Sequence, residues 1–475
     1  MTGSWTLHPD RALPAEPATR QAARSIYQSI AGLPIVSMHG HVPVEWLAHD
    51  IPFADPAQLL VVPDHYLFRM LNSQGTAPHQ LGVPTLDGSL PVETDSRTIW
   101  KRFCQAWPLF RGTPTRLWME TVLVDIFGVT QRPSADAADG IYDHIAAQLA
   151  SPDFKPRALM DKFSIEILGT TDPAWASLSD HKILADMGWG QRVVPTFRPD
   201  AVCNLASPSF AADVLATGAA CGIEVTSYDS YLDALRGQRL RFKAAGSLAT
   251  DHGCSTANTQ PLDKVDAAAL FDAAMRGQEI SPAQALAFEA HMLFMSAQMS
   301  SEDGLVMQIH PGVLRGYDQV NTARYGADKG YDIPYAVEYT RALRPMLEAF
   351  GHNPHFRCIV FTIDEDVYTR ELAPLAGVFP SMRLGAPWWF IDSPEGMRRF
   401  RETATETAGF YNTSGFVDDT RAFCSIPARH DLARRIDAGY LGRLVAEHRL
   451  DLDEAIETAY DLTYTLPRRA YAPVD

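Results

Sequence analysis

The sequence predicts an α/β fold, specifically a (β/α)8 barrel of the TIM type that carries helical insertions. A short apolar run that is rich in β-branched residues, ends in polar residues and leads into a helix-like segment recurs along the 475 residues. Strands that alternate with helices are typical of a parallel sheet, and eight such units suggest closure into a barrel. The eight runs are residues 34–41, 163–172, 192–200, 242–253, 304–312, 357–366, 382–392 and 414–423.

The segments between the runs carry helix signals. Residues 334–351 have apolar residues at spacings of three and four and end at Gly351, so a helix is expected there. Residues 393–410 begin with Ser393, a suitable N-cap, and a proline follows it at the first helical position. The run at 242–253 is rich in Ala and Gly and is the weakest of the strand predictions.

Two gaps between the runs are too long for simple crossovers. Residues from about 43 to 162 contain several helix patterns and are predicted to form an insertion after the first strand. Residues from about 254 to 303 are predicted to form a second insertion. We therefore expect residues 1–475 to form a single barrel domain with two helical insertions, closed by C-terminal helices.

Composition excludes several classes of function. The formal net charge of −16 argues against a general binder of nucleic acid or anionic membranes, although convergent arginines could still bind a small anion. The six cysteines form no C-x-x-C pair, which disfavours a Cys-based zinc site and suits reduced thiols in a cytoplasmic protein. The N-terminus shows no apolar signal-peptide core, and no apolar run is long enough to span a membrane.

Chemically active side chains gather where the predicted strands end. In a parallel barrel these carboxyl ends face one mouth, and catalytic residues collect there. Neutral packing would not need acids, imidazoles and arginines at nearly every such position. The strand ends carry His39, His41, Thr170, Thr171, Asp172, Arg198, Asp251, His252, His310, Asp364, Trp388, Trp389, Asp419 and Arg421.

The first strand ends in the pattern His39-Gly40-His41. Side chains alternate between the two faces of a strand, so both imidazoles should point into the barrel mouth. Two imidazoles at that spacing can share a divalent cation. A carboxylate from another strand, Asp419, would complete a set of two imidazoles and one carboxylate with open positions for a substrate.

Several of these residues have structural alternatives. Arg198 could tie down a loop, and Asp172 and Asp364 could be helix caps or loop acids. The pair Trp388 and Trp389 could be core aromatics, with one ring facing each way.

Two further candidates are open in the same way. His310 is either a member of the site or a buried structural imidazole. Outside the strands, Tyr66 and Arg69 lie three residues apart and share one face if residues 61–75 are helical. The alternative is a packed Tyr66 beside a solvated Arg69.

Longer motifs resemble a known family. The segments "HGHVP", "DHYLFRML", "ILGTTDPAWASLSDHK", "VVPTFRPD", "MQIHPGVLR", "APWWFIDSPEGM" and "DDTRAFCSIPARHDLARR" are similar to uronate isomerase (glucuronate isomerase), of the amidohydrolase superfamily. The resemblance runs in the same order from about residue 20 to the C-terminus. It implies a (β/α)8 barrel that interconverts hexuronate aldoses and ketoses, D-glucuronate with D-fructuronate and D-galacturonate with D-tagaturonate. It also implies one divalent metal ion, commonly zinc, and a homo-oligomer.

The resemblance extends to individual residues. His39, His41 and Asp419 match the family's metal ligands. Arg421 matches the arginine two residues after the ligand aspartate. Tyr66 matches the tyrosine of the family's "DHY" motif, and Arg198 matches the arginine of its "FRPD" motif. We accordingly assign Asp419, Tyr66, Arg421 and His65 to catalysis, and Arg198, Trp389, His310 and Asp172 to substrate binding.

The chain departs from the family pattern in places. Where the resembled family usually has H-C-H, this chain has Gly40 between the two histidines. The family's Asn-rich stretch after the arginine that matches Arg315 is replaced by "GYDQVN", and its "TDSR" motif is replaced by "DDTR". These departures affect loop detail and substrate preference more than the reaction.

Tyr66, with His65, is expected to shuttle the proton between C1 and C2. A tyrosinate base would require nearby cations to depress the phenol pKa.

The main rival function is that of a metal-dependent hydrolase, but no lysine lies at a strand end to bridge two metals. A non-catalytic binding protein for sugar acids is the other alternative. In each case we expect a small sugar-acid ligand, no nucleic acid and no membrane.

Overall fold

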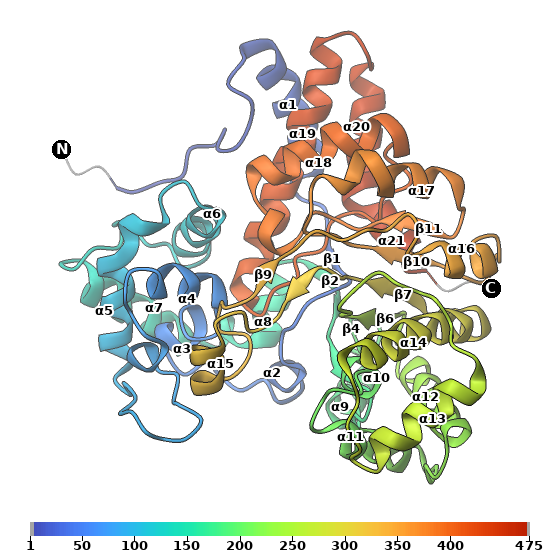
Figure 1. Ribbon diagram of the computed structural model, residues 1–475. Helices are drawn as coiled ribbons and strands as arrows, with labels where there is room; N and C mark the ends of the chain where they lie inside the picture. The colour runs from blue at the N-terminus through green and yellow to red at the C-terminus, as the bar shows by residue number, and fades with distance from the viewer. Residues whose placement is uncertain (1–3, 473–475) are drawn as a thin grey trace.

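The computed structural model describes residues 4–472, and nine short strands form its two parallel sheets (Figure 1). One sheet has the order β1-β2-β4 and the other β11-β10-β7-β6-β5-β3. An antiparallel pair, β8 (Val313–Leu314) and β9 (Ile333–Pro334), lies outside them. The parallel strands are β1 (Ile35–Ser37), β2 (Ile165–Gly169), β3 (Asp172–Pro173), β4 (Val193–Val194), β5 (Phe197–Arg198), β6 (Ala249–His252), β7 (Val306–Ile309), β10 (Cys358–Val360) and β11 (Met382–Leu384).

The two sheets are parts of one ladder. Leu168 pairs with Val193 between β2 and β4, and Asp172 pairs with Phe197 between β3 and β5. The sequence offset is the same in both pairs, so β2 and β3 are successive pieces of one strand, as are β4 and β5. The strands therefore neighbour one another in chain order.

Residues 413–420 connect the last strand to the first. Thr413 forms a parallel bridge with Leu384 of β11. The Asp419 amide donates to the His39 carbonyl at 3.2 Å, and the His41 amide donates to the Thr420 carbonyl at 3.0 Å. The predicted α/β class is confirmed, and these pairings follow the ring order of a (β/α)8 barrel.

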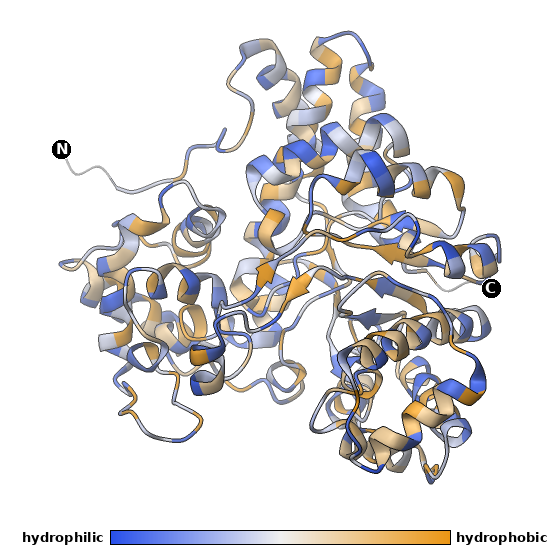
Figure 2. Cartoon of the chain, in the orientation of Figure 1, coloured by the Kyte–Doolittle hydropathy of each residue, from blue (hydrophilic) through white to orange (hydrophobic). Residues whose placement is uncertain are grey.

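Each of the eight predicted runs contains one of these parallel segments. The fourth begins later than expected, because residues up to Ala244 belong to helix α12 and β6 starts only at Ala249. Residues 413–420, in the eighth run, are held by hydrogen bonds without a regular strand. In Figure 2, β6 stands out as hydrophilic among the central strands, because it contains Thr250, Asp251 and His252.

Helices surround the sheet in three groups (Figure 1). Between β1 and β2 lie α2 (Val44–His49), α3 (Pro56–Leu60), α4 (His65–Asn72), α5 (Ser96–Ala106), α6 (Pro114–Thr121), α7 (Ala138–Leu149) and α8 (Pro156–Lys162). The second group is α9 (Ser179–Asp186), α10 (Asp200–Cys203), α11 (Phe210–Cys221), α12 (Tyr228–Ala244), α13 (Lys264–Met275) and α14 (Pro282–Asp303). The remaining helices are α1 (Pro17–Ile30), α15 (Gln319–Tyr325), α16 (Arg344–Phe350), α17 (Ala373–Val378), α18 (Pro394–Ala408), α19 (Ile426–Ala446), α20 (Leu452–Tyr460) and α21 (Leu466–Ala470).

Local capping explains where two predicted helices begin. Ser393 is the N-cap of α18, and its hydroxyl accepts from the Gly396 amide at 3.1 Å, as predicted. The helix expected over 334–351 is wrong in its first half, because α16 begins only at Arg344. The Glu371 carboxylate accepts from the amides of Tyr339 and Thr340 at 2.6 and 3.0 Å, which holds that segment in a non-helical conformation.

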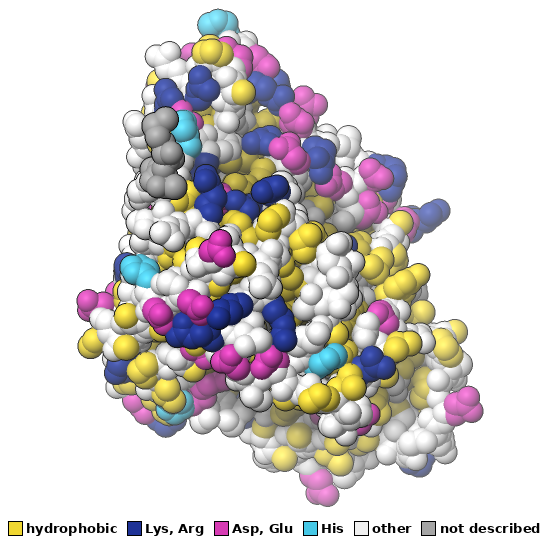
Figure 3. Space-filling model, turned by 90° about the vertical axis from the view of Figure 1, so that its left-hand side faces the viewer, with side chains coloured by type: hydrophobic (Ala, Val, Ile, Leu, Met, Phe, Trp, Pro, Cys, Tyr) yellow, Lys and Arg dark blue, Asp and Glu magenta, His cyan; other side chains and the backbone are white. Residues whose placement is uncertain are grey.

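The face of the molecule formed by the helices between β1 and β2 carries both positive and negative charges. In Figure 3, Lys and Arg lie beside Asp and Glu on this face instead of forming a field of one sign. Within residues 4–472, no helix is long and apolar enough to cross a membrane.

A buried ion pair joins two of the outer helices. Arg401 of α18 donates through Nε and Nη2 to the two carboxylate oxygens of Asp437 of α19, at 2.5 and 2.8 Å. Both residues are buried. Removing one member of such a pair leaves the other charged and desolvated.

We therefore expect Arg401→Met to lower the free energy of unfolding by about 3–5 kcal/mol, measured by urea denaturation. The double variant Arg401→Met/Asp437→Leu should regain most of that loss, because no charge is left unpaired. Equal destabilisation of the single and double variants would contradict this interpretation.

Candidate active site

A cavity of about 310 Å³ opens at the carboxyl ends of the strands. It is lined by residues of α4 and β5, by the segment that follows β1, and by the loops after β7, β11 and Thr413. Nine of the ten residues assigned to the site from sequence line it: His39, His41, His65, Tyr66, Arg198, His310, Trp389, Asp419 and Arg421.

The two histidines that follow β1 face Asp419. His39 Nε2 lies 3.4 Å and His41 Nε2 lies 3.1 Å from Asp419 Oδ1. One ligand atom from each residue lies within 4.8 Å of the others. Two imidazole nitrogens and one carboxylate oxygen, close enough to share an ion, are a donor set that suits a divalent transition metal.

Asp419 is held in place by its backbone. Its φ angle is 43°, in the left-handed region that non-glycine residues seldom adopt. The hydrogen bond from its amide to the His39 carbonyl fixes the carboxylate beside the imidazoles. Burial alone would raise the pKa of Asp419, but hydrogen bonds from His39 and His41 hold it well below its ordinary value.

Asp251 of β6 organises the site from beneath. Its fully buried carboxylate lies 2.7 Å from His310 Nε2, 3.2 Å from Arg198 Nη1 and 3.7 Å from His39 Nδ1. The sequence placed Asp251 at a strand end but gave it no role. It orients one proposed metal ligand and two proposed substrate contacts.

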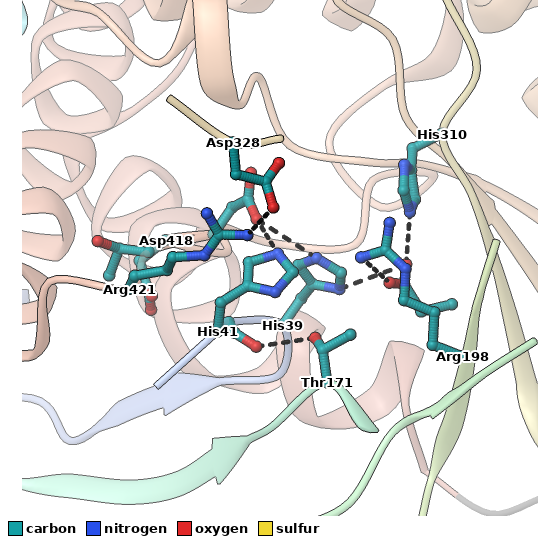
Figure 4. Close-up of polar contacts among 12 residues, drawn as sticks. His39, His41, Thr171, Arg198, His310, Asp328, Asp418 and Arg421 are labelled. Atoms are coloured by element: carbon teal, nitrogen blue, oxygen red, sulfur yellow. Dashed lines mark hydrogen bonds and ion pairs between the residues drawn. The ribbon is translucent and has the colours of Figure 1, made fainter. Parts of the chain in front are cut away.

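Arginines flank the imidazoles on both sides (Figure 4). Arg198 is held by Asp251 and by Asp200, whose Oδ2 accepts from Nε at 2.7 Å. On the other side Arg421 Nη2 donates to Asp328 Oδ2 at 2.9 Å. Arg315 Nη1 lies 3.6 Å from Asp328 Oδ1, so one carboxylate faces two guanidinium groups.

Sequence reasoning gave Arg315 no site role and missed Asp328. Both belong to the connection after β7, where no periodic pattern marks a functional side chain. The Arg315 guanidinium lies 4.9 Å from the centre of the Trp389 ring, which makes the tryptophan part of the cavity wall.

His65 and Tyr66 begin helix α4. The Asp64 carboxylate caps this helix by accepting from the Tyr66 and Leu67 amides at 2.8 and 3.3 Å. The two rings stack with centroids 4.4 Å apart. His65 Nε2 and the Tyr66 hydroxyl are buried and satisfy no hydrogen-bond criterion among the described residues, and both residues line the cavity.

The protonation of this pair differs from the tyrosinate that the sequence analysis considered. Burial raises the pKa of Tyr66 far above its ordinary value, although the Arg429 guanidinium lowers it in part. Burial, followed by the charge of Arg421, lowers the pKa of His65 to about 3. At neutral pH the tyrosine is therefore a phenol and the histidine a neutral imidazole.

Asp172 is not brought to the cavity. Its carboxylate accepts from the Thr170 hydroxyl at 2.6 Å, and His181 Nε2 lies 3.8 Å away. This buried cluster turns Asp172 away from the cavity, so its assignment to substrate binding is corrected. Asp364 accepts from the Asp366 amide at 3.1 Å and is a loop acid, as its alternative reading predicted.

Trp388 and Trp389 have different surroundings. Trp388 is buried, stacks on Phe361 with centroids 4.5 Å apart, and lies 4.9 Å from the His310 ring. Trp389 is partly exposed and adopts a φ of 50°. Trp388 thus packs beneath the imidazoles while Trp389 forms part of the wall.

Comparison with known proteins shows which family this chain belongs to. The glucuronate isomerase family model matches residues 17–471. The uronate isomerase of Rhizobium meliloti (strain 1021) is 53% identical over 465 residues, which cover 98% of this chain and 99% of that protein. This chain belongs to the glucuronate isomerase family.

Solved structures of the family share the fold. The glucuronate isomerase of Caulobacter crescentus superposes with a TM-score of 0.95 at 49% identity, covering 98% of this chain and 97% of that one. The uronate isomerase of Thermotoga maritima superposes with a TM-score of 0.91 at 25% identity, covering 98% of this chain and all of that one. The family resemblance inferred from the motifs is confirmed.

The position between the two histidines, Gly40, has room for a side chain. A Cβ at Gly40 would lie 3.5 Å from Asp418 Oδ1 and 3.6 Å from the carbonyl oxygens of Gly169 and Thr420. These are ordinary contacts, and none involves an imidazole. The residue between the two histidines therefore points away from the cluster of donors.

We expect the purified protein to bind one divalent cation per chain and His39→Ala to bind less than about a tenth as much, because one of the three ligands is lost. Equilibrium dialysis followed by elemental analysis measures this. His181→Asn is the matched control, because that buried imidazole bonds to Thr170 outside the cavity. Equal metal content in all three proteins would contradict the assignment.

Proposed function

We propose that this chain is an aldose–ketose isomerase that interconverts D-glucuronate with D-fructuronate and D-galacturonate with D-tagaturonate. The observation that carries this proposal is the presence, in one cavity, of a divalent-metal donor set, unpartnered proton-transfer groups and guanidinium groups on opposite sides. The carboxylate of a sugar acid can bind the guanidinium groups, and its hydroxyl and carbonyl oxygens can bind the metal. Membership of the glucuronate isomerase family supports the same conclusion.

The substrate carboxylate has a defined place in this scheme. Asp328 now occupies Arg421 and faces Arg315. A ligand carboxylate can take over the same donors if the Asp328 side chain turns aside, since guanidinium groups bind carboxylates through paired hydrogen bonds. Trp389, held against Arg315, would cover one side of the sugar.

His39, His41 and Asp419 would hold the metal, and zinc matches this set of nitrogen and oxygen donors. The buried Nδ1 of His39 has no hydrogen bond among the described residues but faces Asp251, an arrangement that orients a ligand imidazole. When bound, the ion would act as a Lewis acid that polarises oxygens of the substrate.

The chain's own groups move the protons. Isomerisation transfers hydrogen between C2 and C1 and a proton between the two oxygens, through an enediolate. The ionised Asp419 accepts a hydroxyl proton as the sugar ring opens. The neutral His65 imidazole accepts the proton from C2, and the resulting imidazolium returns it to C1 of the enediolate. A substrate carboxylate bound to Arg421 offsets the positive charge that lowers the pKa of His65 and so makes the imidazole more basic in the complex. The Tyr66 phenol donates a hydrogen bond to the developing oxygen charge, and Arg198 and Arg421 offset that charge.

A metal-dependent hydrolase is the alternative that shares most of this chemistry. No lysine is among the described residues that line the cavity, which disfavours a second, lysine-bridged metal. The unpartnered His65 and Tyr66 suit a transfer between carbon atoms better than the activation of one water molecule. A pure binding protein would have no need for these two groups.

The direct test incubates the protein with D-glucuronate and measures ketose formation. We expect turnover in the wild type and a loss of at least about 100-fold in kcat for Asp419→Asn, since general-base catalysis typically contributes that much. Circular dichroism and the melting temperature check that the variant is folded. Full activity of a folded Asp419→Asn would remove the carboxylate from the chemistry, and an inactive wild type would overturn the proposed reaction.

Exchange of the substrate C2 hydrogen isolates the transfer between carbons. In deuterated water, we expect His65→Gln to reduce incorporation of deuterium by at least about 100-fold and Tyr66→Phe to reduce it less, because the imidazole is the proposed base. Proton NMR of the sugar measures both. Phe68→Leu, in the buried face of the same helix, is the control for indirect packing effects. Normal exchange in His65→Gln would transfer the base role to another residue.

The homo-oligomer, the cytoplasmic location and the single-domain description with two insertions stay predictions. The net charge of −16 and the mixed charges of the face in Figure 3 support a small-molecule substrate over a nucleic acid.

A further inference from the structure

A second cavity lies at the opposite ends of the strands from the candidate active site. Its volume is about 530 Å³. Cys358 and Met382, the first residues of β10 and β11, mark the amino ends of these strands; Cys358 lines the cavity, as do Ser381 just before β11 and residues of α21. These elements lie close to the C-terminal end of the described chain, on the right-hand side of Figure 1. The substrate proposed above enters at the carboxyl ends, so this cavity is separate from it.

Three arginines line this cavity: Arg357, Arg383 and Arg469. No acidic residue is among its described lining residues, and within residues 4–472 none of the three forms an ion pair. Arg468, the neighbour of Arg469 on α21, pairs with Glu166 and does not line this cavity. Positive charge thus gathers at this cavity without a counter-charge from the described chain.

Hydrogen bonds to carbonyl groups position two of the guanidinium groups. Arg357 Nη1 donates to the carbonyls of Arg469 and Ala472 at 3.1 and 2.8 Å. Arg383 Nη1 donates to the carbonyls of Pro380 and Met382 at 2.9 and 2.7 Å. Each group uses one terminal nitrogen in these bonds, so its other N–H groups are available to a ligand.

A buried hydroxyl at the same cavity also lacks a partner. Ser381 is 4% exposed, and its Oγ has no hydrogen bond among the described residues. A buried polar atom without a partner costs free energy unless a ligand or water satisfies it. Burial and the nearby charges of Arg469 and Arg357 lower the pKa of Arg383, which reports the same uncompensated positive potential.

We propose that this cavity binds a phosphate group, either as inorganic phosphate or as the phosphate of a small phosphorylated metabolite. Three guanidinium groups and a hydroxyl match a dianion with several acceptor oxygens better than a single carboxylate, which carries one charge. The net charge of −16 of the whole protein disfavours a polynucleotide. The site is independent of the proposed isomerase reaction.

Isothermal titration calorimetry of the full chain with sodium phosphate, at constant ionic strength, tests the proposal. We expect saturable binding in the wild type and a Kd at least about tenfold higher in Arg469→Gln, which loses one charged donor. Arg468→Gln is the matched control, because it makes the same change one residue away on the same helix at an arginine paired with Glu166. It should bind phosphate as the wild type does.

Two further comparisons are needed. One shows whether phosphate binds at this cavity or at the candidate active site, and the other shows whether the ligand is free phosphate or a phosphorylated metabolite. Arg383→Gln should weaken binding as Arg469→Gln does, whereas Arg421→Gln should not. Tighter binding of a sugar phosphate than of inorganic phosphate would identify a phosphorylated metabolite as the ligand, and the reverse order would identify free phosphate. The proposal is overturned if the wild type does not bind phosphate, if Arg468→Gln and Arg469→Gln lose binding equally, or if only Arg421→Gln loses it.

Discussion

Two backbone hydrogen bonds between the segment after the first strand and residues 419–420 determine the candidate active site. They run from the Asp419 amide to the His39 carbonyl and from the His41 amide to the Thr420 carbonyl. Residues separated by about 380 positions in the sequence are thereby joined as neighbours. The same contact that closes the ring places a carboxylate beside two imidazoles, so the metal-binding geometry is a consequence of the fold. The left-handed conformation of Asp419 is maintained by this contact.

A buried polar layer supports the closing contact and attaches the first helical insertion to it. Asp418 accepts from Ser37 Oγ at 2.5 Å, and His430 Nε2 lies 3.0 Å from the same carboxylate. Arg429 Nη1 donates to Asp392 at 2.5 Å, and the guanidinium lies 3.6 Å from the centre of the Trp118 ring. Burying a guanidinium costs several kcal/mol unless hydrogen bonds and a carboxylate compensate, as they do here. Since Trp118 also contacts Tyr66, with ring centroids 5.5 Å apart, this layer links the barrel to the wall that carries the proposed proton-transfer groups.

The sequence predicted the parts of the structure that follow from local rules. Alternation of side chains along a strand is such a rule, and it placed His39 and His41 on one face. The carboxyl ends of parallel strands share one edge, which brought Arg198, His310 and Asp419 into the same prediction. The site residues that were missed depend on tertiary contacts that leave no local pattern. Asp328 reaches Arg421 from a connecting loop, and Asp172 is turned away by Thr170. Residues 335–341 were predicted as helix, but the distant Glu371 binds amides within that segment.

Donors that are distant in the chain should converge on one cation at the contact between His39 and Asp419. X-ray absorption spectroscopy of the metal-loaded protein measures the ligand shell directly. We expect two imidazole nitrogens and a carboxylate oxygen at about 2.0–2.2 Å for zinc. A shell with sulfur ligands, or one made only of oxygen atoms, would contradict it.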